Sequence, residues 1–572
     1  MKGEKKLKEK QYLEQLHRLW GKNWPAHLPK EPHYPFGEIP LTAYLREWAR
    51  RTPDKPCLIF YGNEITFKQL DDLSNRFASF LAAKGLKKGD RVAVFLPNCP
   101  QFHIAFFGIL KIGCIHVPVN PMFKEHELLY ELNDADAQVI VTLDQLYPIV
   151  QTIKDQTNLR EVVVTSFADY LPENPTIPVH ETLLVPKKNF PGTIDLMQML
   201  AVQSPGYPDV EVGLDDVVAL NYTGGTTGMP KGCEHTQRNM IYTAACAATF
   251  LYEITPDDMC LTYLPIFWIA GEDSGILSPV FSGATHILLA RWDAKAMLTA
   301  IDRYKVTHTG GVVDNIVEMM EHPDVKKYDL SSIKVTTVSS FVKKINMDYR
   351  ARWKELTGAI MREASWGMTE THTVDTFTNG MQDNDMDLKS QPIFVGLPMP
   401  GTEFKIVDFD TGELVPLGHE GEIVVRTPSL LKSYWRKPEA TKQALRDGWL
   451  FTGDIGMIDE EGYLHFLGRR KEMLKVKGMS VFPSEIEAFL GRHPAIVGSG
   501  VIGKPEPDKG EVPVAFIKLH KDYEGKITEE ELSNWCRQNM ASYKVPLIKI
   551  VKELPMTATG KVKKEELKKL IK

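Results

Sequence analysis

Short apolar stretches alternate with amphipathic ones through the first part of the chain. Nearly continuous apolar runs, which are typical of buried strands, lie at 91–98, 114–120, 136–144 and 217–222. Helical spacing, with an apolar residue every three or four positions, marks 65–86 and 100–113. Thr66 and Gln69 form a capping-box pattern where the first of these helices begins, and we expect Gly85 to end it. Strands that alternate with helices in this way predict a parallel sheet covered on both faces.

The last hundred residues follow a different pattern. Residues 512–520 alternate apolar and polar positions, as a strand with one exposed face does. Thr528 and Glu531 form a second capping-box pattern, and 563–572 has the composition of a charged helix. Together these elements predict a small α+β unit. We place its boundary with the larger α/β part in the charged segment 468–478 (GRRKEMLKVKG), which lacks an apolar face.

Composition and charge exclude several classes of protein. With 572 residues, of which 43% are hydrophobic and 25% charged, the chain has the composition of a soluble protein with more than one domain. A net charge of -6 gives no reason to expect a nucleic acid partner, which requires a basic face. The seven cysteines are widely spread and form no CxxC pair, so neither a disulfide framework nor a structural zinc is predicted. This fits a reducing compartment.

The first ten residues, MKGEKKLKEK, are rich in lysine. The residues that follow lack the apolar core and the small-residue cleavage site of a secretory signal. No apolar run in the chain approaches the roughly 20 residues that a membrane-spanning helix needs. We therefore expect a cytoplasmic protein whose N-terminus is a solvated helix. The alternative is a peripheral contact between these lysines and anionic lipid.

The strongest local motif is YTGGTTGMPKG at 222–232. Its glycines allow the backbone to approach a phosphate closely, while threonine hydroxyls and a lysine add donors and charge. The alternative is a Ser/Thr/Gly-type surface loop. The segment is not a P-loop of the Walker type, because Lys231 follows Pro230 and precedes Gly232, whereas that motif needs Gly-Lys-Ser/Thr.

Five motifs in order resemble the adenylate-forming superfamily, which includes acyl-CoA synthetases, luciferase and peptide-synthetase adenylation domains. They are YTGGTTGMPKG, SWGMTET (365–371), GWLFTGD (448–454), GRRKEMLKVKG and PMTATGK (555–561). The resemblance implies an α/β fold with a large N-terminal domain of packed, mostly parallel sheets flanked by helices. A small mobile α+β C-terminal domain completes it. The implied ranges are 1–467 for the AMP- and acyl-binding domain, 468–471 for a hinge and 472–572 for the C-terminal domain.

The resemblance also assigns a nucleotide site. The residues implied to bind ATP or AMP are Thr223, Gly224, Gly225, Thr226, Thr227, Gly228, Lys231, Trp366, Gly367, Thr369, Asp454 and Arg469. Trp366 would stack on adenine, although a core aromatic is the alternative. Asp454 and Arg469 would bind the ribose hydroxyls. Glu370 would be an oxygen ligand for Mg²⁺, and otherwise a carboxylate at the start of a helix.

Two lysines are implied to be catalytic. Lys561 would reach the carboxylate and the α-phosphate, where a fixed cation lowers the barrier to attack; the alternative is a solvated lysine. Lys475 matches a lysine that some family members use in a second domain orientation. The implied pivot between the two orientations is Lys471, and Gly478 matches a glycine that lines the pantetheine tunnel for coenzyme A. We expect the neighbouring Lys563 and Lys564 to be solvated.

Two departures from the family pattern lie in the part of the chain that would bind the acid. Trp268 stands where many members that take fatty or aryl acids carry histidine, and Phe341 and Val342 replace a turn of small residues beside the acyl group. These changes predict an acyl pocket that is lined by Trp268, Phe341 and Val342. We expect this pocket to take an acid of a different chain length or shape. Glu272 and Asp273 are expected in a solvated turn; the alternative is that they face this pocket.

The prediction is an ATP-dependent acid:CoA ligase that forms an acyl-AMP, releases pyrophosphate and then makes the acyl-CoA thioester. The N-terminal region most resembles bacterial and archaeal long-chain fatty acid:CoA ligases, so a medium- or long-chain fatty acid is the first hypothesis and an aryl or functionalised short acid the second. Mg²⁺, ATP and coenzyme A are the expected cofactor and co-substrates, and a homodimer is a further hypothesis. A carrier-protein adenylation enzyme, an oxygenase and a non-catalytic acyl or nucleotide sensor are the rival functions.

Overall fold

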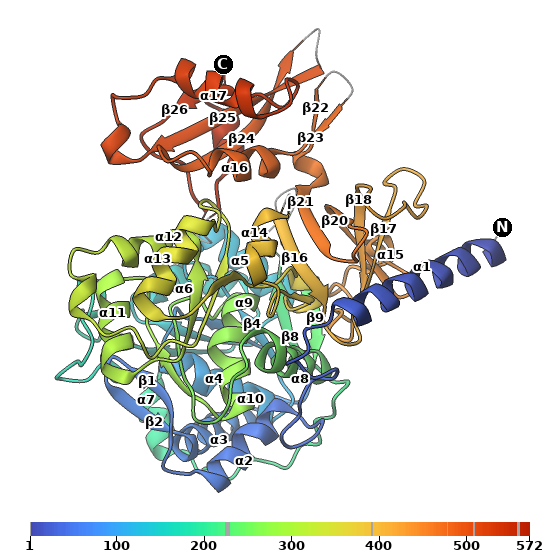
Figure 1. The fold of residues 1–572 in the computed structure, drawn as a ribbon. Helices are drawn as coiled ribbons and strands as arrows, with labels where there is room; N and C mark the ends of the chain where they lie inside the picture. Colours follow the sequence, from blue (N-terminus) through green and yellow to red (C-terminus); the bar gives the residue numbers. More distant parts are fainter. Residues whose placement is uncertain are drawn as a thin grey trace.

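The computed structural model in Figure 1 describes residues 2–223, 229–390, 393–476, 479–506, 510–557 and 561–571. A large α/β body contains most of the chain, and the C-terminal part forms a smaller unit at the top of the view. The predicted fold class is confirmed. Among the described residues, no helix combines the length and the apolar character needed to span a bilayer.

The first sheet contains the strands that the apolar runs predicted. In spatial order they are β7 (Ile194–Asp195), β6 (Glu161–Thr165), β5 (Val139–Leu143), β3 (Arg91–Phe95), β4 (Ile115–Pro118), β8 (Val217–Tyr222) and β9 (Gly232–Thr236). All neighbours pair in parallel except β8 and β9, which form an antiparallel hairpin. The helices that follow its strands are α4 (Pro100–Lys111), α5 (Glu125–Ala135), α6 (Tyr147–Ile153) and α7 (Leu196–Val202).

The second sheet is also parallel except at one edge. Its order is β14 (Met361–Glu363), β13 (Val335–Ser339), β12 (His308–Val312), β10 (Met259–Thr262), β11 (Thr285–Leu288), β1 (Pro56–Phe60) and β2 (Asn63–Thr66), with β1 and β2 antiparallel. The helices of this part are α2 (Leu41–Arg51), α3 (Phe67–Ala83), α8 (Gln237–Cys246), α9 (Ile269–Glu272), α10 (Ser278–Ser282), α11 (Ala294–Tyr304), α12 (Val313–Glu321) and α13 (Met347–Thr357). A single apolar core joins the first two sheets.

The third sheet is antiparallel, a feature the sequence patterns did not single out. Its strands are β15 (Thr376–Phe377), β16 (Ile393–Pro398), β21 (Leu464–Arg469), β20 (Trp449–Ile458), β18 (Gly421–Arg426) and β17 (Glu403–Val407), with β19 (Leu445–Arg446) beside β20. Two short helices, α14 (Met386–Lys389) and α15 (Pro438–Ala444), lie in the same part of the chain. The parallel sheets therefore belong to the first 363 residues.

Helix α1 (Lys2–Asn23) packs against this part of the molecule through its second half (Figure 1). Leu13, Leu16 and Trp20 are buried in the same apolar cluster as strands β16–β20. The Trp20 indole donates a hydrogen bond to the Gly462 carbonyl at 2.9 Å. The prediction of a solvated helix was therefore wrong for the second half of α1, because a leucine and tryptophan stripe on it finds an apolar partner.

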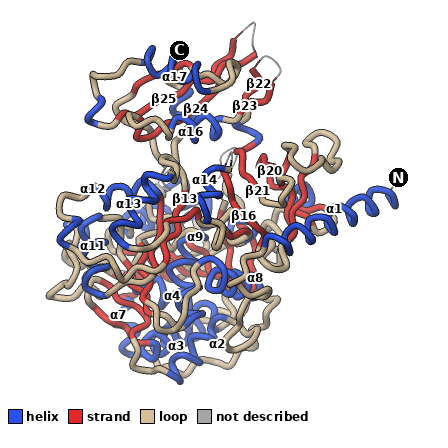
Figure 2. The backbone as a smooth tube through the Cα atoms, in the orientation of Figure 1, coloured by secondary structure: helices blue, strands red, loops and turns tan. Residues whose placement is uncertain are grey.

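The C-terminal unit has its own sheet (Figure 2), and its buried apolar residues form a separate core. The sheet order is β23 (Met479–Val481), β22 (Leu474–Val476), β25 (Gly510–Leu519) and β24 (Ile496–Glu506), and β26 (Leu547–Ile550) pairs in parallel with β25. Its helices are α16 (Pro483–Leu490), α17 (Glu529–Asn539) and α18 (Lys564–Lys568). The mixture of antiparallel strands and helices is the α+β unit that the sequence predicted; the domain and hinge boundaries at 467 and 471 stay a prediction.

Both predicted capping boxes are present. The Thr66 hydroxyl accepts from the Gln69 amide at 3.1 Å, and the Gln69 side chain accepts from the Thr66 amide at 2.8 Å. Thr528 and Glu531 make the equivalent pair at the start of α17. Each box satisfies two backbone donors that a helix leaves unpaired, which fixes where α3 and α17 begin.

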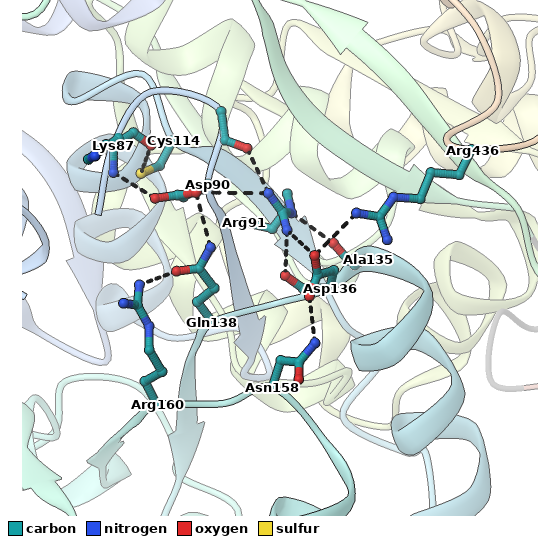
Figure 3. Close-up of polar contacts among 11 residues, drawn as sticks. Lys87, Asp90, Arg91, Cys114, Ala135, Asp136, Gln138, Asn158, Arg160 and Arg436 are labelled. Atoms are coloured by element: carbon teal, nitrogen blue, oxygen red, sulfur yellow. Dashed lines mark hydrogen bonds and ion pairs between the residues drawn. The ribbon is translucent and has the colours of Figure 1, made fainter. Parts of the chain in front are cut away.

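A polar cluster ties the first sheet to the segment before α15 (Figure 3). Asp136, which ends α5, accepts from the Arg91 guanidinium at 2.7 Å, from Arg436 at 3.1 Å and, through its other oxygen, from Asn158 at 2.8 Å. Hydrogen bonds from Asn158 and Arg436, together with the charges of Arg91 and Arg436, hold the pKa of the Asp136 carboxyl below its ordinary value. Backbone hydrogen bonds pair the segment 432–436 with β9, the strand that follows the glycine-rich loop.

Candidate active site

The glycine-rich loop is closed at its base. β8 leads directly to Thr223, whose amide donates to the Lys231 carbonyl at 3.0 Å, while the Lys231 amide donates to the Thr223 hydroxyl at 3.2 Å. The Pro230 carbonyl accepts from the Tyr130 hydroxyl at 2.9 Å. The predicted phosphate-binding residues 224–228 lie outside the described residues. Their loop starts at the carboxyl end of a parallel strand, where α/β sheets bind ligands.

Asp454 and Arg469 face each other across two antiparallel strands. Asp454 of β20 is the register partner of Arg469 of β21, and the Arg469 Nε lies 2.7 Å from Asp454 Oδ1. Asp454 is 3% exposed. Burial raises the pKa of its carboxyl to about 6, although Arg469 lowers it. At neutral pH the group is therefore a buried carboxylate, a suitable acceptor for the paired hydroxyls of a ribose.

Trp366 contacts the same carboxylate. Its indole Nε1 donates to Asp454 Oδ2 at 3.2 Å, and its ring meets Phe404 edge-on with centroids 5.5 Å apart. At 6% exposure the side chain belongs to the apolar cluster of the third sheet. In this structure Trp366 therefore orients Asp454 from within the core, which is the alternative that the sequence left open. Stacking on adenine stays a prediction.

Glu370 is buried beside Tyr434. Its Oε1 accepts from the Tyr434 hydroxyl at 2.8 Å, and the Lys231 ammonium lies 4.1 Å from the centre of the Tyr434 ring. Tyr434 thus brings Glu370 and Lys231 together. Among the described residues, no group of three or more His, Cys, Asp or Glu side chains could hold a metal alone. A carboxylate already aligned by a hydroxyl fits a Mg²⁺ that takes its other ligands from phosphates and water.

Gly367 and Thr369 shape the turn that carries Glu370. A Cβ at Gly367 would lie 1.9 Å from the Thr373 carbonyl oxygen, so only glycine fits there. The Thr369 carbonyl accepts from His235 Nε2 at 2.8 Å. The close approach of two backbone segments, rather than ligand contact, is the observed reason for this glycine.

Lys561 of the C-terminal unit is exposed and lies near Asp454 and Arg469. Its ammonium is 5.0 Å from the centre of the Phe341 ring, which belongs to the N-terminal body. Desolvation by surrounding protein lowers the pKa of Lys561, and the charge of Arg469 lowers it further, while Asp454 opposes the shift. The structure therefore brings together Asp454, Arg469 and Lys561, which come from both parts of the chain.

The residues predicted for the second half-reaction are less fully described. Lys471 lies in a 3-10 turn (Arg470–Glu472) after β21 and is exposed. Lys475 lies in β22, where the structure describes its backbone and not its side chain. Gly478 lies outside the described residues. The assignments of the pivot, the second catalytic lysine and the pantetheine tunnel stay predictions.

The residues predicted to line the acyl pocket lie in two different surroundings. Trp268 is half-buried at the start of α9 and packs edge-on against Phe267, with centroids 5.2 Å apart. Val342, in contrast, lies in an apolar cluster whose other buried members belong to the C-terminal unit. The observed partners of Val342 are therefore residues of another domain, and the acyl pocket lined by Trp268, Phe341 and Val342 stays a prediction.

Glu272 and Asp273 are buried, so the prediction of a solvated turn was wrong. Glu272 Oε2 accepts from the Asn221 side chain at 3.0 Å, and Asp273 Oδ1 accepts from the Ser278 hydroxyl at 2.8 Å. Burial raises the pKa of Glu272 to about 8 and that of Asp273 to about 7. Asn221, a polar residue inside the apolar run 217–222, was the sequence signal that a buried polar partner exists there.

The prediction that Lys564 is solvated was also wrong. Its ammonium lies 2.5 Å from a Glu472 carboxylate oxygen and 3.1 Å from Glu487, so it is paired rather than solvated. Glu472 follows the predicted pivot Lys471 directly, and Lys564 lies three residues after Lys561. This pairing links the end of the hinge to the loop that carries Lys561, and no local sequence signal marks it.

Comparisons with known proteins agree with this geometry. The model for AMP-binding enzymes matches residues 45–435, and the model for the AMP-binding enzyme C-terminal domain matches 485–561. The chain is 35% identical over 563 residues to a long-chain-fatty-acid–CoA ligase of Bacillus subtilis, covering 97% of this chain and 98% of that protein. It is 30% identical over 545 residues to 4-coumarate–CoA ligase 1 of Solanum tuberosum, covering 93% of each.

Solved structures show the same likeness. The anthranilate CoA ligase AuaEII in complex with anthranoyl-AMP superimposes with a TM-score of 0.79 at 28% identity, covering 93% of this chain and 97% of that one. ATP-bound MatB from Rhodopseudomonas palustris gives a TM-score of 0.77 at 27% identity, covering 93% and 99%. On its motifs, its fold and these matches, the chain belongs to the family of AMP-binding enzymes.

Proposed function

We propose that the protein is an AMP-forming acyl-CoA synthetase that activates a medium- or long-chain fatty acid. In the first half-reaction a carboxylate oxygen attacks the α-phosphorus of ATP, the bond to the β-phosphate oxygen breaks, and pyrophosphate leaves. In the second half-reaction the thiol of coenzyme A attacks the acyl carbon, loses its proton and expels AMP.

The position of Lys561 carries the proposal. The charges of Arg469 and Asp454 act on the pKa of Lys561, and the charge of Lys561 acts on the pKa of Asp454, so the three groups lie near one another. If Asp454 binds the ribose, Lys561 would lie within reach of the acid and the α-phosphate. A cation there would stabilise the negative charge that builds up on the phosphoryl oxygens.

Other residues of the site complete the first half-reaction. The base of the glycine-rich loop, between Thr223 and Lys231, would direct its amides and hydroxyls to the phosphates. Glu370, aligned by Tyr434, would hold Mg²⁺ together with phosphate oxygens, and the ion would neutralise part of the triphosphate charge.

The second half-reaction needs a different arrangement of residues around the same nucleotide. A thiol must reach the acyl carbon, whereas Lys561 lies near Asp454 and Arg469 in this structure. We propose that the C-terminal unit turns about Lys471, which would withdraw Lys561 and present Lys475 and Gly478 to the pantetheine arm.

The acid is assigned from the relatives. The Bacillus subtilis relative bears the name of a long-chain-fatty-acid–CoA ligase. An aryl acid is the second candidate, favoured by the bulk of Trp268 and by the likeness to the anthranilate ligase.

Peripheral membrane binding and a homodimer stay predictions from the sequence. The lysine-rich start of α1 extends away from the body in Figure 1, as the lipid hypothesis requires. A non-catalytic sensor is disfavoured because such a protein has no need of Lys561 beside the nucleotide residues.

A panel of acids tests the proposed substrate. Saturated acids of 8, 12 and 16 carbons, benzoate, 2-aminobenzoate and malonate would each be supplied with ATP, Mg²⁺ and coenzyme A. We expect AMP and acyl-CoA in equal amounts, with kcat/KM for one fatty acid at least about 10-fold above benzoate, because each buried methylene adds binding energy. A preference for an aryl acid would select the second candidate, and the absence of AMP with every acid would contradict the proposal.

Lys561→Ala tests the catalytic assignment. We expect acid-dependent exchange of pyrophosphate into ATP to fall by a factor on the order of 10²–10³, because the developing phosphoryl charge loses its fixed cation. Lys563→Ala is the matched control: it removes an exposed lysine from the same loop whose partner is Glu566 at 3.3 Å, and exchange should stay within about twofold of wild type. Exchange at the wild-type rate in Lys561→Ala would refute the assignment.

Glu370→Gln tests the proposed metal ligand. The amide keeps the shape and the contact with Tyr434 but removes the charge, so the Mg²⁺ concentration for half-maximal exchange should rise at least about 10-fold. Tyr434→Phe leaves the carboxylate in place and removes one hydrogen bond, so a change of only a few-fold is expected. An unchanged Mg²⁺ requirement in Glu370→Gln would exclude this residue as a ligand.

A further inference from the structure

The turn at 340–345, which we name the docking turn, is held firmly in the N-terminal body. The Ser340 amide and hydroxyl donate to the two oxygens of Glu363 at 2.9 and 2.6 Å. The Lys344 ammonium folds back and donates to the carbonyls of Ser340 and Phe341, each at 2.9 Å. The turn directly follows β13, at the carboxyl end of a parallel strand. Its side chains are therefore presented from a fixed backbone.

Val342 projects from the docking turn into the C-terminal unit. It is 9% exposed and packs in one apolar cluster with five buried residues of that unit, Ile502, Val514, Phe516, Leu554 and Leu567. Gly498 of β24 provides the space, because a Cβ there would lie 2.3 Å from Val342 Cγ1. Two methyl groups cannot approach each other this closely. The two domains can therefore meet as they do only because residue 498 has no side chain.

Phe341, the preceding residue of the same turn, faces the catalytic lysine. Its ring centre is 5.0 Å from the Lys561 ammonium, within the range of a cation–π contact. Lys344, at the other end of the turn, has its pKa lowered by burial, and the charges of Glu487 in α16 and of Glu363 oppose that shift. The docking turn therefore touches the C-terminal unit at the domain surface and at Lys561 simultaneously.

We propose that Val342 and Phe341 are positioning residues for the first half-reaction. Val342, seated against Gly498, sets the orientation of the C-terminal unit, and Phe341 holds the Lys561 ammonium on the substrate side. The inference rests on the proposed function and adds residues to it that act through Lys561. Because a misplacement of about 1 Å can cost on the order of 10²-fold in rate, a contact far from the nucleotide can govern adenylation.

A cycle of two substitutions tests the contact. Gly498→Ala adds a methyl group where Val342 Cγ1 lies, Val342→Ala removes that group, and the double variant restores the fit. We expect Gly498→Ala to lower acid-dependent pyrophosphate exchange by on the order of 10-fold or more, and the double variant to recover to within a few-fold of wild type. Thioester formation from supplied acyl-AMP and coenzyme A, which does not need this orientation, should stay unchanged in all three.

Two further variants complete the design. Gly491→Ala is the matched control, since Gly491 has a φ of -62° and a Cβ there would meet nothing nearer than 3.5 Å; we expect wild-type exchange. Phe341→Leu keeps an apolar side chain and removes the ring, and exchange should fall a few-fold.

The outcomes separate this inference from the proposed function. Equal loss of both half-reactions in Gly498→Ala, wild-type exchange in that variant, or no recovery in the double variant would each overturn the inference alone. If the wild-type protein releases no pyrophosphate with any acid, the proposed function fails and the inference fails with it.

Discussion

A buried carboxylate, Asp454, is paired with Arg469, and the charge of Lys561 from the C-terminal unit acts on the same carboxyl. The ladder of the third sheet fixes the first pair, because Asp454 and Arg469 are register partners. Lys561 is near them only because the C-terminal unit sits where it does. Desolvation raises the pKa of Asp454 and lowers that of Lys561, and each of the two charges opposes the shift of the other group. The rest of the site depends on this meeting.

Local patterns predicted the parts of the fold and site that depend on near neighbours in sequence. The capping boxes at Thr66 and Thr528, the apolar strands and the glycine-rich loop each follow from a few adjacent residues. The stacking of Trp366 could not be judged from sequence, because its burial under Phe404 depends on the antiparallel sheet, whose pairings join distant segments. The burial of Glu272 beside Asn221 depends in the same way on two separate elements.

The bulk of Phe341 and Val342 has structural partners that the sequence did not suggest. From the sequence, bulk beside the acyl group predicted a reshaped acyl pocket. In the structure Val342 has five buried partners in the C-terminal unit, and the ring centre of Phe341 lies 5.0 Å from the Lys561 ammonium. Only the glycine at 498 makes this contact possible, and nothing in the sequence near Gly498 points to residue 342. Acid activation and domain orientation are therefore linked through one rigid turn.

The central claim is that this domain orientation serves adenylation and must be left before thioester formation. V342C/G498C tests it directly, because a Cβ at 498 would lie 3.8 Å from the Cβ of residue 342, within disulfide geometry, and the seven native cysteines are all buried. Under oxidation the variant should retain pyrophosphate exchange and lose acyl-CoA formation, which a reductant should restore. Formation of acyl-CoA by the oxidised variant at the rate of the reduced one would contradict the account.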